Sequence, residues 1–241
     1  MSHRNRRVAE AARLHRVEER RVRGQTLLEG PHLLAEAVRA GAPLVEVFAL
    51  SEDADTRHLA RSAGVELVVV GEEALRRLSS TRNPQSPVTV IQIPPSRLDP
   101  VRSLLVAWQI SDPGNLGTMI RTAAAFGLDV GTMAGSADPW SPKVLRAASG
   151  GHFQTGIAAL DDMGSLDAIK VAAVPSGGGP ASSLPKGRLA LLVGSEAQGL
   201  PATVIAGADA RVTIPMTGPT ESLNAAAAAA ILAYEISLRP K

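Results

Sequence analysis

Three short polar blocks in the C-terminal half of this 241-residue chain hold the side chains that could do chemistry. Each block follows an apolar run and places one or two polar residues among glycines or at the start of a helix. In open α/β sheets, ligands bind in the crevice beyond the carboxyl ends of the strands, which is where such blocks lie. The blocks are residues 112–117 running into Arg121, residues 194–200, and residues 214–216 followed by 221–224.

The first block, Asp-Pro-Gly-Asn at 112–115, indicates a turn followed by a helix. Pro113 and Gly114 favour the turn, and Asn115 is a good N-cap for a helix that begins at Leu116. Backbone N–H groups exposed at that helix start favour an anion. Arg121 follows about one and a half turns later, on the face that also carries residues 118 and 125. The same pattern fits a capped helix with a solvent-facing arginine.

The second block, Gly-Ser-Glu-Ala-Gln-Gly at 194–199, is neither a dinucleotide fingerprint nor a phosphate-binding P-loop. Its glycine spacing differs from the fingerprint, and it lacks the Gly-Lys-Ser/Thr ending of a P-loop. Glu196 stands between two glycines at a strand end, where it could anchor a ligand or the arginine. The alternative is a tight turn without chemistry.

The third block turns the chain before the last helix. We expect Thr220 or Ser222 to cap that helix. Ser222 and Asn224 would then project from its first turn, near the positive end of its dipole. Capping without chemistry is again the alternative.

Composition narrows the protein class. Apolar residues make up 45% and charged residues 20% of the chain, which is typical of an ordinary globular protein. The sequence has no cysteine, so disulfides, thiolate metal sites and cysteine nucleophiles are excluded. We see no secretory signal, and no apolar run approaches the roughly 18 residues of a membrane span. We therefore expect a cytoplasmic protein without a metal.

Positive charge is concentrated at the N-terminus. Residues 1–25 contain eight arginines against three glutamates, a net charge of +5, whereas the whole chain carries only +2. A cationic end on a near-neutral body is the pattern expected for phosphate contact. A solvated helix with ion pairs four residues apart is the alternative.

The elements that must position these blocks alternate between helix and strand, as in an α/β protein. We expect helices at 4–23, at 33–38 (ending near Gly41), and at 56–62, 72–78, 116–126, 142–148, 202–206 and 221–238. We expect strands at 44–50, 65–70, 88–93, 104–110, 128–133, 171–174, 189–193 and 210–214. Apolar strands without alternation indicate a parallel sheet covered on both faces.

Prolines divide the chain. Three of them between residues 94 and 100 cannot lie inside a helix or a central strand, so they predict a linker. The expected domains are a basic N-terminal helix (1–25), a smaller α/β domain (26–95), a linker (96–103) and a larger C-terminal domain (104–241).

As a set, the three blocks resemble the SPOUT class of methyltransferases, in the SpoU (TrmH) branch of RNA ribose 2′-O-methyltransferases. The resemblance covers residues 104–241, and residues 27–93 are similar to the substrate-binding domain often attached to that branch, through the Glu-Gly-Pro-His-Leu-Leu run at 29–34. It implies a knotted parallel-sheet catalytic domain preceded by a smaller RNA-binding α/β domain. It also implies a homodimer with the site near the subunit interface.

The resemblance implies S-adenosylmethionine as the cofactor, held mainly by backbone groups. The implied cofactor-binding residues are Val174, Pro175, Gly194, Glu196, Gly199, Ile214, Met216, Ser222, Leu223 and Asn224. The implied catalytic residues are Asn115, Arg121, Glu196, Ser222 and Asn224. A guanidinium has no accepting lone pair, so we interpret Arg121 as a phosphate clamp and oxyanion stabiliser rather than a base.

Aromatic residues make up only 2% of the chain, which argues against recognition of RNA by base stacking. Recognition by shape and phosphate is favoured, with ribosomal RNA preferred over transfer RNA by analogy. The expected RNA contacts are Arg4, Arg6, Arg7, Arg13, Arg16, Arg20, Arg21, Arg23, His32, Lys143 and Arg146. Three alternatives remain: a transfer RNA methyltransferase, an RNA-binding protein with a decayed catalytic domain, and a nucleotide-dependent enzyme such as a dehydrogenase.

Overall fold

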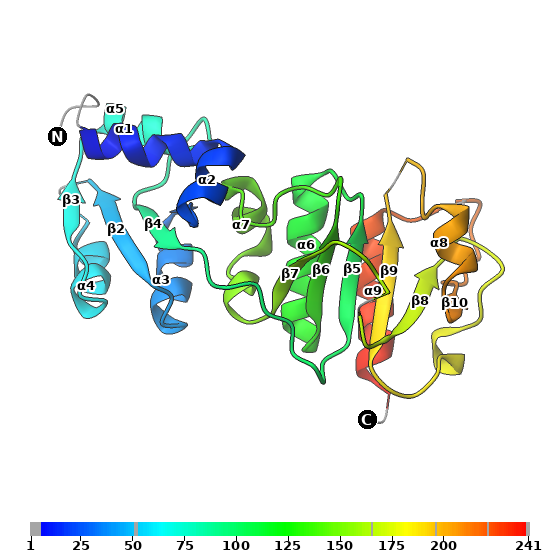
Figure 1. The fold of residues 1–241 in the computed structure, drawn as a ribbon. Coiled ribbons are helices and arrows are strands. Elements are labelled where there is room, and N and C mark those ends of the chain that lie inside the picture. Colours follow the sequence, from blue (N-terminus) through cyan, green and yellow to red (C-terminus); the bar gives the residue numbers. More distant parts are fainter. Residues whose placement is uncertain (1–5, 51–52, 165, 196, 221, 240–241) are drawn as a thin grey trace. The chain divides into compact units, whose positions relative to one another are not determined.

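The structure, a computed structural model, describes residues 6–50, 53–164, 166–195, 197–220 and 222–239. The chain divides into two compact units, shown in Figure 1. Unit 1 comprises Met1–Pro95 and Trp140–Phe153, and unit 2 comprises Ser96–Pro139 and Gln154–Lys241. The chain therefore leaves unit 2 once, contributes a short segment to unit 1, and returns.

Unit 1 is built on a four-stranded sheet in the order β1-β4-β2-β3. Strand β4 is antiparallel to both β1 and β2, whereas β2 and β3 are parallel and are joined through α4. The strands are β1 (Gln25–Glu29), β2 (Leu44–Ala49), β3 (Leu67–Val69) and β4 (Val88–Gln92). The helices are α1 (Arg6–Ala12), α2 (Val17–Arg23), α3 (Pro31–Arg39), α4 (Ala54–Ser62), α5 (Glu72–Leu78) and α7 (Pro142–Ala148).

The helix expected over residues 4–23 is interrupted. A 3₁₀ turn at Arg13–His15 separates α1 from α2, because Arg16 has an extended backbone with ψ of 135°. Gly24 ends α2 in the left-handed conformation, as expected from its type, with φ of 62°. Strand β1 directly follows and is a feature that the sequence pattern does not predict.

The segment Trp140–Phe153 packs in unit 1, although the sequence assigns it to the C-terminal domain. Leu145 of α7 belongs to a buried cluster with Leu28 and Ile91. Thr26 Oγ1 donates a hydrogen bond to the carbonyl of Trp140 over 2.6 Å. The partner strand lies more than 100 residues away in the sequence, so a local pattern carries no signal for this packing.

Unit 2 contains a six-stranded sheet in the order β10-β8-β9-β5-β6-β7, with every neighbouring pair parallel. This confirms the expected α/β class with a parallel sheet. The strands are β5 (Leu104–Trp108), β6 (Asp129–Met133), β7 (Ile157–Leu160), β8 (Ile169–Ala173), β9 (Leu189–Gly194) and β10 (Ala210–Val212). The helices are α6 (Pro113–Phe126), α8 (Ala202–Ala206) and α9 (Ala225–Ser237).

The core of unit 2 lies between its sheet and the helices. Val106, Ala172 and Leu192 of neighbouring strands are fully or almost fully buried. Helices α6 and α9 pack against each other on one face of the sheet, as Figure 1 shows.

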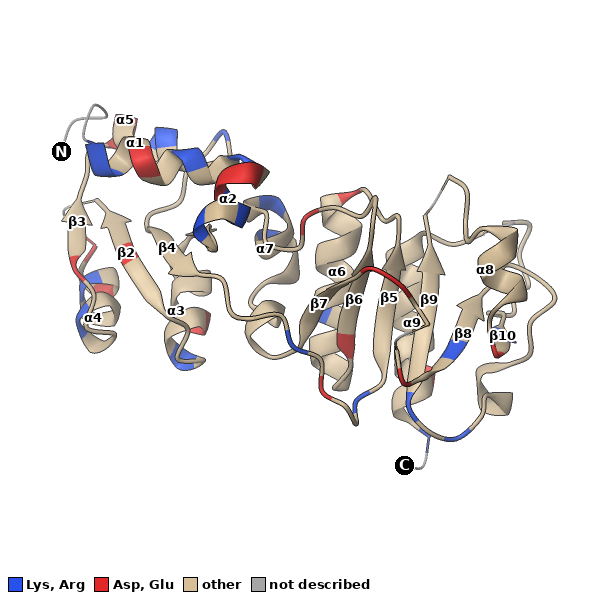
Figure 2. Cartoon of the chain, viewed as in Figure 1, with Lys and Arg blue, Asp and Glu red and all other residues tan. Residues whose placement is uncertain are grey.

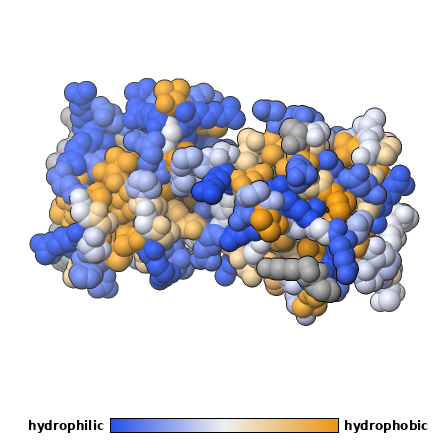
Figure 3. Space-filling view, turned by 60° about the horizontal axis from the view of Figure 1, so that its bottom comes forward, coloured by the Kyte–Doolittle hydropathy of each residue, from blue (hydrophilic) through white to orange (hydrophobic). Residues whose placement is uncertain are grey.

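The face drawn in Figure 3 carries hydrophobic side chains as separate patches among hydrophilic ones. Throughout the part of the chain that is described, no helix is long and apolar enough to cross a membrane.

Several features of unit 2 differ from the sequence prediction. Strand β5 ends at Trp108 instead of residue 110, because Gln109 has a left-handed backbone. Helix α9 begins at Ala225 instead of residue 221. Strand β7 at the edge of the sheet was not expected, since only four residues form it.

Candidate active site

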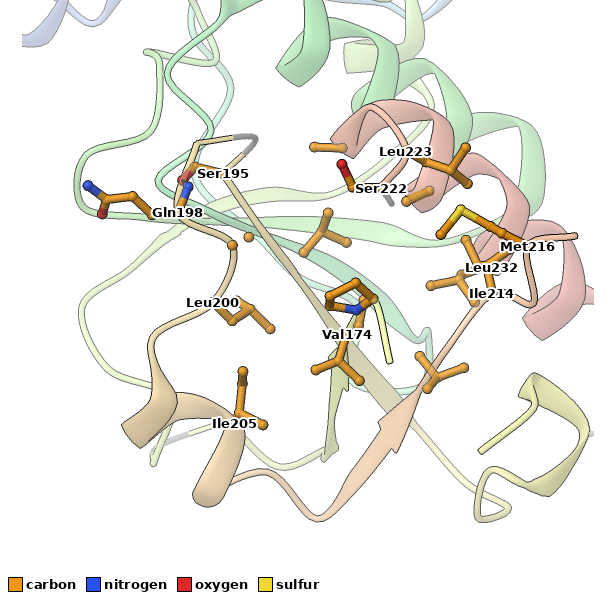
Figure 4. Close-up of a pocket in the computed structure, with 18 residues that line it drawn as sticks. Val174, Ser195, Gln198, Leu200, Ile205, Ile214, Met216, Ser222, Leu223 and Leu232 are labelled. Atoms are coloured by element: carbon orange, nitrogen blue, oxygen red, sulfur yellow. Dashed lines mark hydrogen bonds between the residues drawn. The ribbon is translucent and has the colours of Figure 1, made fainter. Parts of the chain in front are cut away.

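The carboxyl ends of β8, β9 and β10 border a cavity of about 400 Å³, within the range of ligand pockets. Figure 4 shows Ile214, Met216, Leu223 and Leu232 on one side of the cavity, facing a second group on the other side. The second group consists of Val174, Ser195, Leu200 and Ile205. Its walls are therefore largely apolar, with hydroxyl groups and backbone at the strand ends.

The cavity gathers most of the predicted cofactor residues. Those that line it are Val174, Pro175, Gly194, Gly199, Ile214, Met216, Ser222 and Leu223. Asn224 is not part of the lining, and Glu196 lies outside the described residues.

Sequence reasoning missed the remaining lining residues. They are Ala173, Val193, Ser195, Gln198, Leu200, Ile205, Val212, Ala225, Ala228 and Leu232. Three of them belong to the second polar block, whose glycines already marked it as a loop. The others are apolar side chains of strand ends, α8 and α9, whose composition does not distinguish a cavity wall from a core.

The loop after β9 folds back tightly, as the alternative interpretation of the second block expects. The carbonyl of Ser195 accepts a hydrogen bond from the N–H of Gly199 over 2.8 Å. A Cβ atom on Gly194 would lie only 2.2 Å from the carbonyl carbon of Gly199. Backbone atoms cannot yield to such a contact, so the close return of the loop requires glycine at position 194.

Asp112, and not Asn115, caps α6. The Oδ1 atom of Asp112 accepts from the N–H of Asn115 over 2.9 Å. The sequence prediction is wrong here by one short turn, because Pro113 fits the first helical position, where its missing N–H needs no partner. Asn115 therefore projects from within the first turn of the helix.

Asn224 caps α9, in place of the predicted Thr220 or Ser222. Its Oδ1 accepts from the N–H groups of Ala226 and Ala227, over 2.9 and 3.2 Å. Ser222 consequently lies before the helix, in the segment that lines the cavity.

The two asparagines meet across the helix starts. Asn224 Nδ2 donates to Asn115 Oδ1 over 3.1 Å. Because the cap fixes Oδ1 of Asn224, its amide nitrogen faces Asn115. The structure thus brings together two predicted catalytic residues that are 109 positions apart in the chain.

Arg121 lies in the middle of α6 with its side chain exposed. Thr118 and Ala125 are exposed beside it, which confirms that the three residues share a face. Arg121 does not line the cavity. We find no side-chain hydrogen bond from Arg121 to another residue that the structure describes.

Most of the N-terminal arginines are engaged with carboxylates. Figure 2 shows blue and red residues side by side along α1 and α2. The ion pairs are Arg6–Glu10, Arg7–Glu46, Arg7–Glu66, Arg13–Glu19, Arg16–Glu19 and Arg23–Glu19. This pairing is what the solvated-helix alternative expects. Arg21 is exposed, and Arg4 lies outside the described residues.

Arg7 bridges two glutamates that differ in burial. A hydrogen bond from Arg7 lowers the pKa of the exposed Glu66 carboxyl. Burial raises the pKa of the Glu46 carboxyl, although the charge of Arg7 opposes this change. The guanidinium of Arg7 is thus tied to strand β2 and to the residue just before β3 in unit 1.

Arg20 requires a correction to the predicted RNA contacts. Its side chain is buried at 4% exposure and donates to the carbonyls of Leu14 and His15 over 2.8 and 2.9 Å. It therefore stabilises the turn between α1 and α2 and cannot reach a phosphate, so Arg20 is not an RNA contact.

Arg146 is also tied down, by the buried carboxylate of Glu29. Its Nη1 donates to Glu29 over 2.9 Å and to Ser80 Oγ over 2.6 Å, and Thr81 Oγ1 donates to Glu29 over 2.8 Å. His32 Nε2 lies 3.1 Å from Ser149 Oγ. Lys143 is exposed on α7. Lys143 is thus accessible, as an RNA contact needs to be. His32 is within hydrogen-bond distance of Ser149, the C-cap residue of α7.

Comparisons with known proteins match both halves of the chain. A family model described as the SpoU rRNA Methylase family matches residues 102–234, and one described as the MRM3-like substrate binding domain matches residues 5–89. The 23S rRNA (guanosine(2553)-2′-O)-methyltransferase RlmP of Bacillus subtilis is 33% identical over 243 residues, covering 98% of this chain and 97% of that protein.

Two solved structures are similar over nearly their whole length. The SpoU methyltransferase AviRb from Streptomyces viridochromogenes, in complex with the cofactor AdoMet, gives a TM-score of 0.87 at 26% identity, covering 97% of both chains. The AdoMet-bound rRNA methyltransferase from Sinorhizobium meliloti gives a TM-score of 0.84 at 25% identity, covering 98% of this chain and 95% of the other.

Proposed function

Because this chain belongs to the SpoU rRNA methylase family, we propose that it transfers a methyl group from S-adenosylmethionine to a ribose 2′-hydroxyl of ribosomal RNA. One observation carries the proposal: the cavity beside β8, β9 and β10 collects eight of the residues expected to hold the cofactor. Two similar structures are described as holding AdoMet, and the Bacillus relative is named for 2′-O-methylation of 23S rRNA.

The residues that line the cavity fit S-adenosylmethionine. Apolar side chains such as Ile214 and Leu223 suit a flat purine ring, and the hydroxyls of Ser195 and Ser222 with nearby backbone groups suit its polar ends. No lysine or arginine stands among the described lining residues, so no cation there opposes a sulfonium. When bound, S-adenosylmethionine supplies a methyl group on positively charged sulfur.

The chain itself must orient the acceptor and stabilise its charge. A ribose hydroxyl is a poor nucleophile. In-line alignment with the methyl group can lower the activation free energy by on the order of 7–11 kcal/mol. We assign this orientation to Asn115 and Asn224, which hold each other in place. Arg121 clamps a substrate phosphate and stabilises the developing oxyanion. Its guanidinium cannot accept the proton, which passes to water or to a phosphate.

We propose that the active unit is a homodimer. Arg121 is exposed and does not line the cavity of its own chain, which supports a site completed by a second subunit. Helix α9 exposes Ile231 and Tyr234 at 40% and 50%, and its C-cap residue Leu238 is exposed at 63%. Tyr234 packs edge-on against Phe126 of α6, with ring centroids 5.9 Å apart. Exposed apolar side chains of this kind mark an interaction surface. The trefoil knot and the cytoplasmic location are also part of the proposal and are supported by family membership.

The test combines calorimetry with mapping of the product. Titration of the full chain with S-adenosylmethionine should show saturable binding, and a radiolabelled methyl group should appear on ribosomal RNA as a single 2′-O-methylated ribose. Failure to bind S-adenosylmethionine would overturn the proposal. Label on transfer RNA alone, or on a base instead of a ribose, would overturn the assigned substrate or acceptor.

The dimer is tested on its own. Sedimentation should give the mass of two chains, and Tyr234→Glu should shift the protein to one chain and remove transfer. An unchanged dimer with Tyr234→Glu would place the interface elsewhere.

A further inference from the structure

Gln109 ends the central strand β5 in a conformation that side chains rarely adopt. Its φ is 57°, in the left-handed region where a Cβ atom crowds the backbone. Ser149 is the other non-glycine residue with positive φ in the described part of the chain, and it caps α7. Gln109 caps no helix. A glycine at position 109 would adopt this backbone conformation without strain. The presence of a glutamine side chain there therefore needs an explanation.

The backbone on both sides of Gln109 is held by the loop after β6. Ser136 Oγ donates to the carbonyl of Ala107 over 3.0 Å, and the N–H of Ala137 donates to the carbonyl of Ile110 over 2.9 Å. These bonds fix the strand end just before and just after Gln109. The left-handed conformation is therefore held in place by the loop after β6.

The aliphatic part of the Gln109 side chain is held as well. It lies across Gly135, where an added Cβ atom would come within 3.1 Å of Gln109 Cγ. The residue is nevertheless exposed, and we find no hydrogen bond from its amide to any residue that the structure describes. The stem is thus anchored while the amide is presented to solvent, which is the arrangement of a preorganised recognition group.

Gln109 directly follows β5, at the carboxyl ends of the strands, where the candidate active site lies. Trp108 pairs with Gly194, so β5 ends directly beside β9, at the strand spacing of about 4.8 Å. Gly194 and Ser195 line the cavity. Asn115, to which we assign the ribose, follows six residues after Gln109 in the chain.

Resting on the proposed function, we propose that Gln109 determines specificity by reading the base of the nucleotide that receives the methyl group. A side-chain amide offers one acceptor and two donor hydrogens side by side. It therefore recognises a base edge that presents a donor next to an acceptor. Proteins that bind unpaired RNA read splayed-out bases through such edges. Gln109 contacts the substrate base and takes no part in moving the proton.

The experiment compares three variants on RNA fragments that differ only in the base at the methylated position. Gln109→Gly removes both the strain and the amide, Gln109→Ala removes the amide but keeps the strain, and Gln109→Glu keeps the shape but leaves only acceptors. We expect each variant to lose about tenfold of the kcat/KM preference for the natural base. Affinity for S-adenosylmethionine should stay within twofold. Gln109→Gly should also melt at a higher temperature than Gln109→Ala.

The exposed Gln154 provides a matched control, since Gln154→Glu should leave base preference unchanged. If the wild-type chain methylates RNA and the three Gln109 variants retain its full base preference, the inference is overturned and the proposed function stands. If the wild-type chain transfers no methyl group to any RNA, the proposed function itself fails. A loss of kcat equal for all four bases would show a structural role and would also overturn the inference.

Discussion

Asn224 donates its side-chain amide to Oδ1 of Asn115 over 3.1 Å, while its own Oδ1 caps α9. One residue therefore sets the start of α9 and the orientation of a side chain on α6. The cap contributes to the stability of the fold, and the hydrogen bond to Asn115 orients a side chain of the candidate site. Two substitutions can separate these contributions.

Asn224→Ala and Asn224→Asp should differ in stability and agree in activity. Alanine removes the cap and should lower the free energy of unfolding by about 1 kcal/mol in urea denaturation. Aspartate still caps the helix but cannot donate to Asn115. We expect Asn224→Asp to retain wild-type stability and lose methyl transfer at least tenfold. Full activity of Asn224→Asp would remove Asn224 from the catalytic set.

Arg121→Ala should abolish methyl transfer with little effect on the fold. The side chain is exposed and lies outside the cavity lining, so the melting temperature should stay within about 2 °C. Affinity for S-adenosylmethionine, measured by calorimetry, should change by no more than a few-fold. Arg211→Ala, on the exposed face of β10, is the matched control and should transfer methyl groups normally. Normal transfer by Arg121→Ala would contradict the assigned role.

Gly194→Ala should disrupt the loop after β9. The added Cβ atom would lie 2.2 Å from the carbonyl carbon of Gly199, so the loop must move. Overpacking of this kind costs about 1–3 kcal/mol of unfolding free energy. Calorimetry should show loss of S-adenosylmethionine binding. Gly218→Ala is the control because its Cβ atom would meet nothing within 4 Å. Equal binding by both variants would show that the loop geometry is not needed.

Glu29→Ala should be the most destabilising of the charge changes in unit 1. Glu29 is buried and paired with Arg146, so its removal takes away a charged acceptor that this guanidinium shares with the hydroxyls of Ser79 and Thr81. We expect a loss of about 3 kcal/mol in urea denaturation. The exposed Glu72–Arg76 pair is the comparison, and Glu72→Ala should cost less than about 1 kcal/mol. Equal losses would show that Arg146 holds α7 by its packing alone.

Local chemistry explains why much of the fold was predictable. Helix α5 and helix α7 have the bounds that the sequence predicts, because apolar spacing and, in α7, the side-chain cap from Ser141 are local signals. Gly24 ends α2 as its type requires. The second and third blocks line the cavity because the ends of parallel strands meet at one edge of a sheet.

The features that were missed depend on contacts between distant residues. Strand β1 forms because β4 pairs with it, some 60 residues later. Arg20 and Arg146 look like free cations in the sequence, yet buried carbonyls and a buried carboxylate hold them. The strain at Gln109 arises from a loop of another strand. No window of neighbouring residues contains this information.

The contribution of Trp140–Phe153 to unit 1 bears on how such proteins evolve. Residues before the proline linker lack Leu145, Trp140 and Phe153, which complete the cluster around Leu28. A recombination breakpoint at that linker would separate residues 1–95 from these side chains and leave a cavity in the hydrophobic core of unit 1. Unit 1 is therefore incomplete without a segment from the C-terminal half of the chain, so an exchange of unit 1 between proteins has to carry residues 140–153 with it.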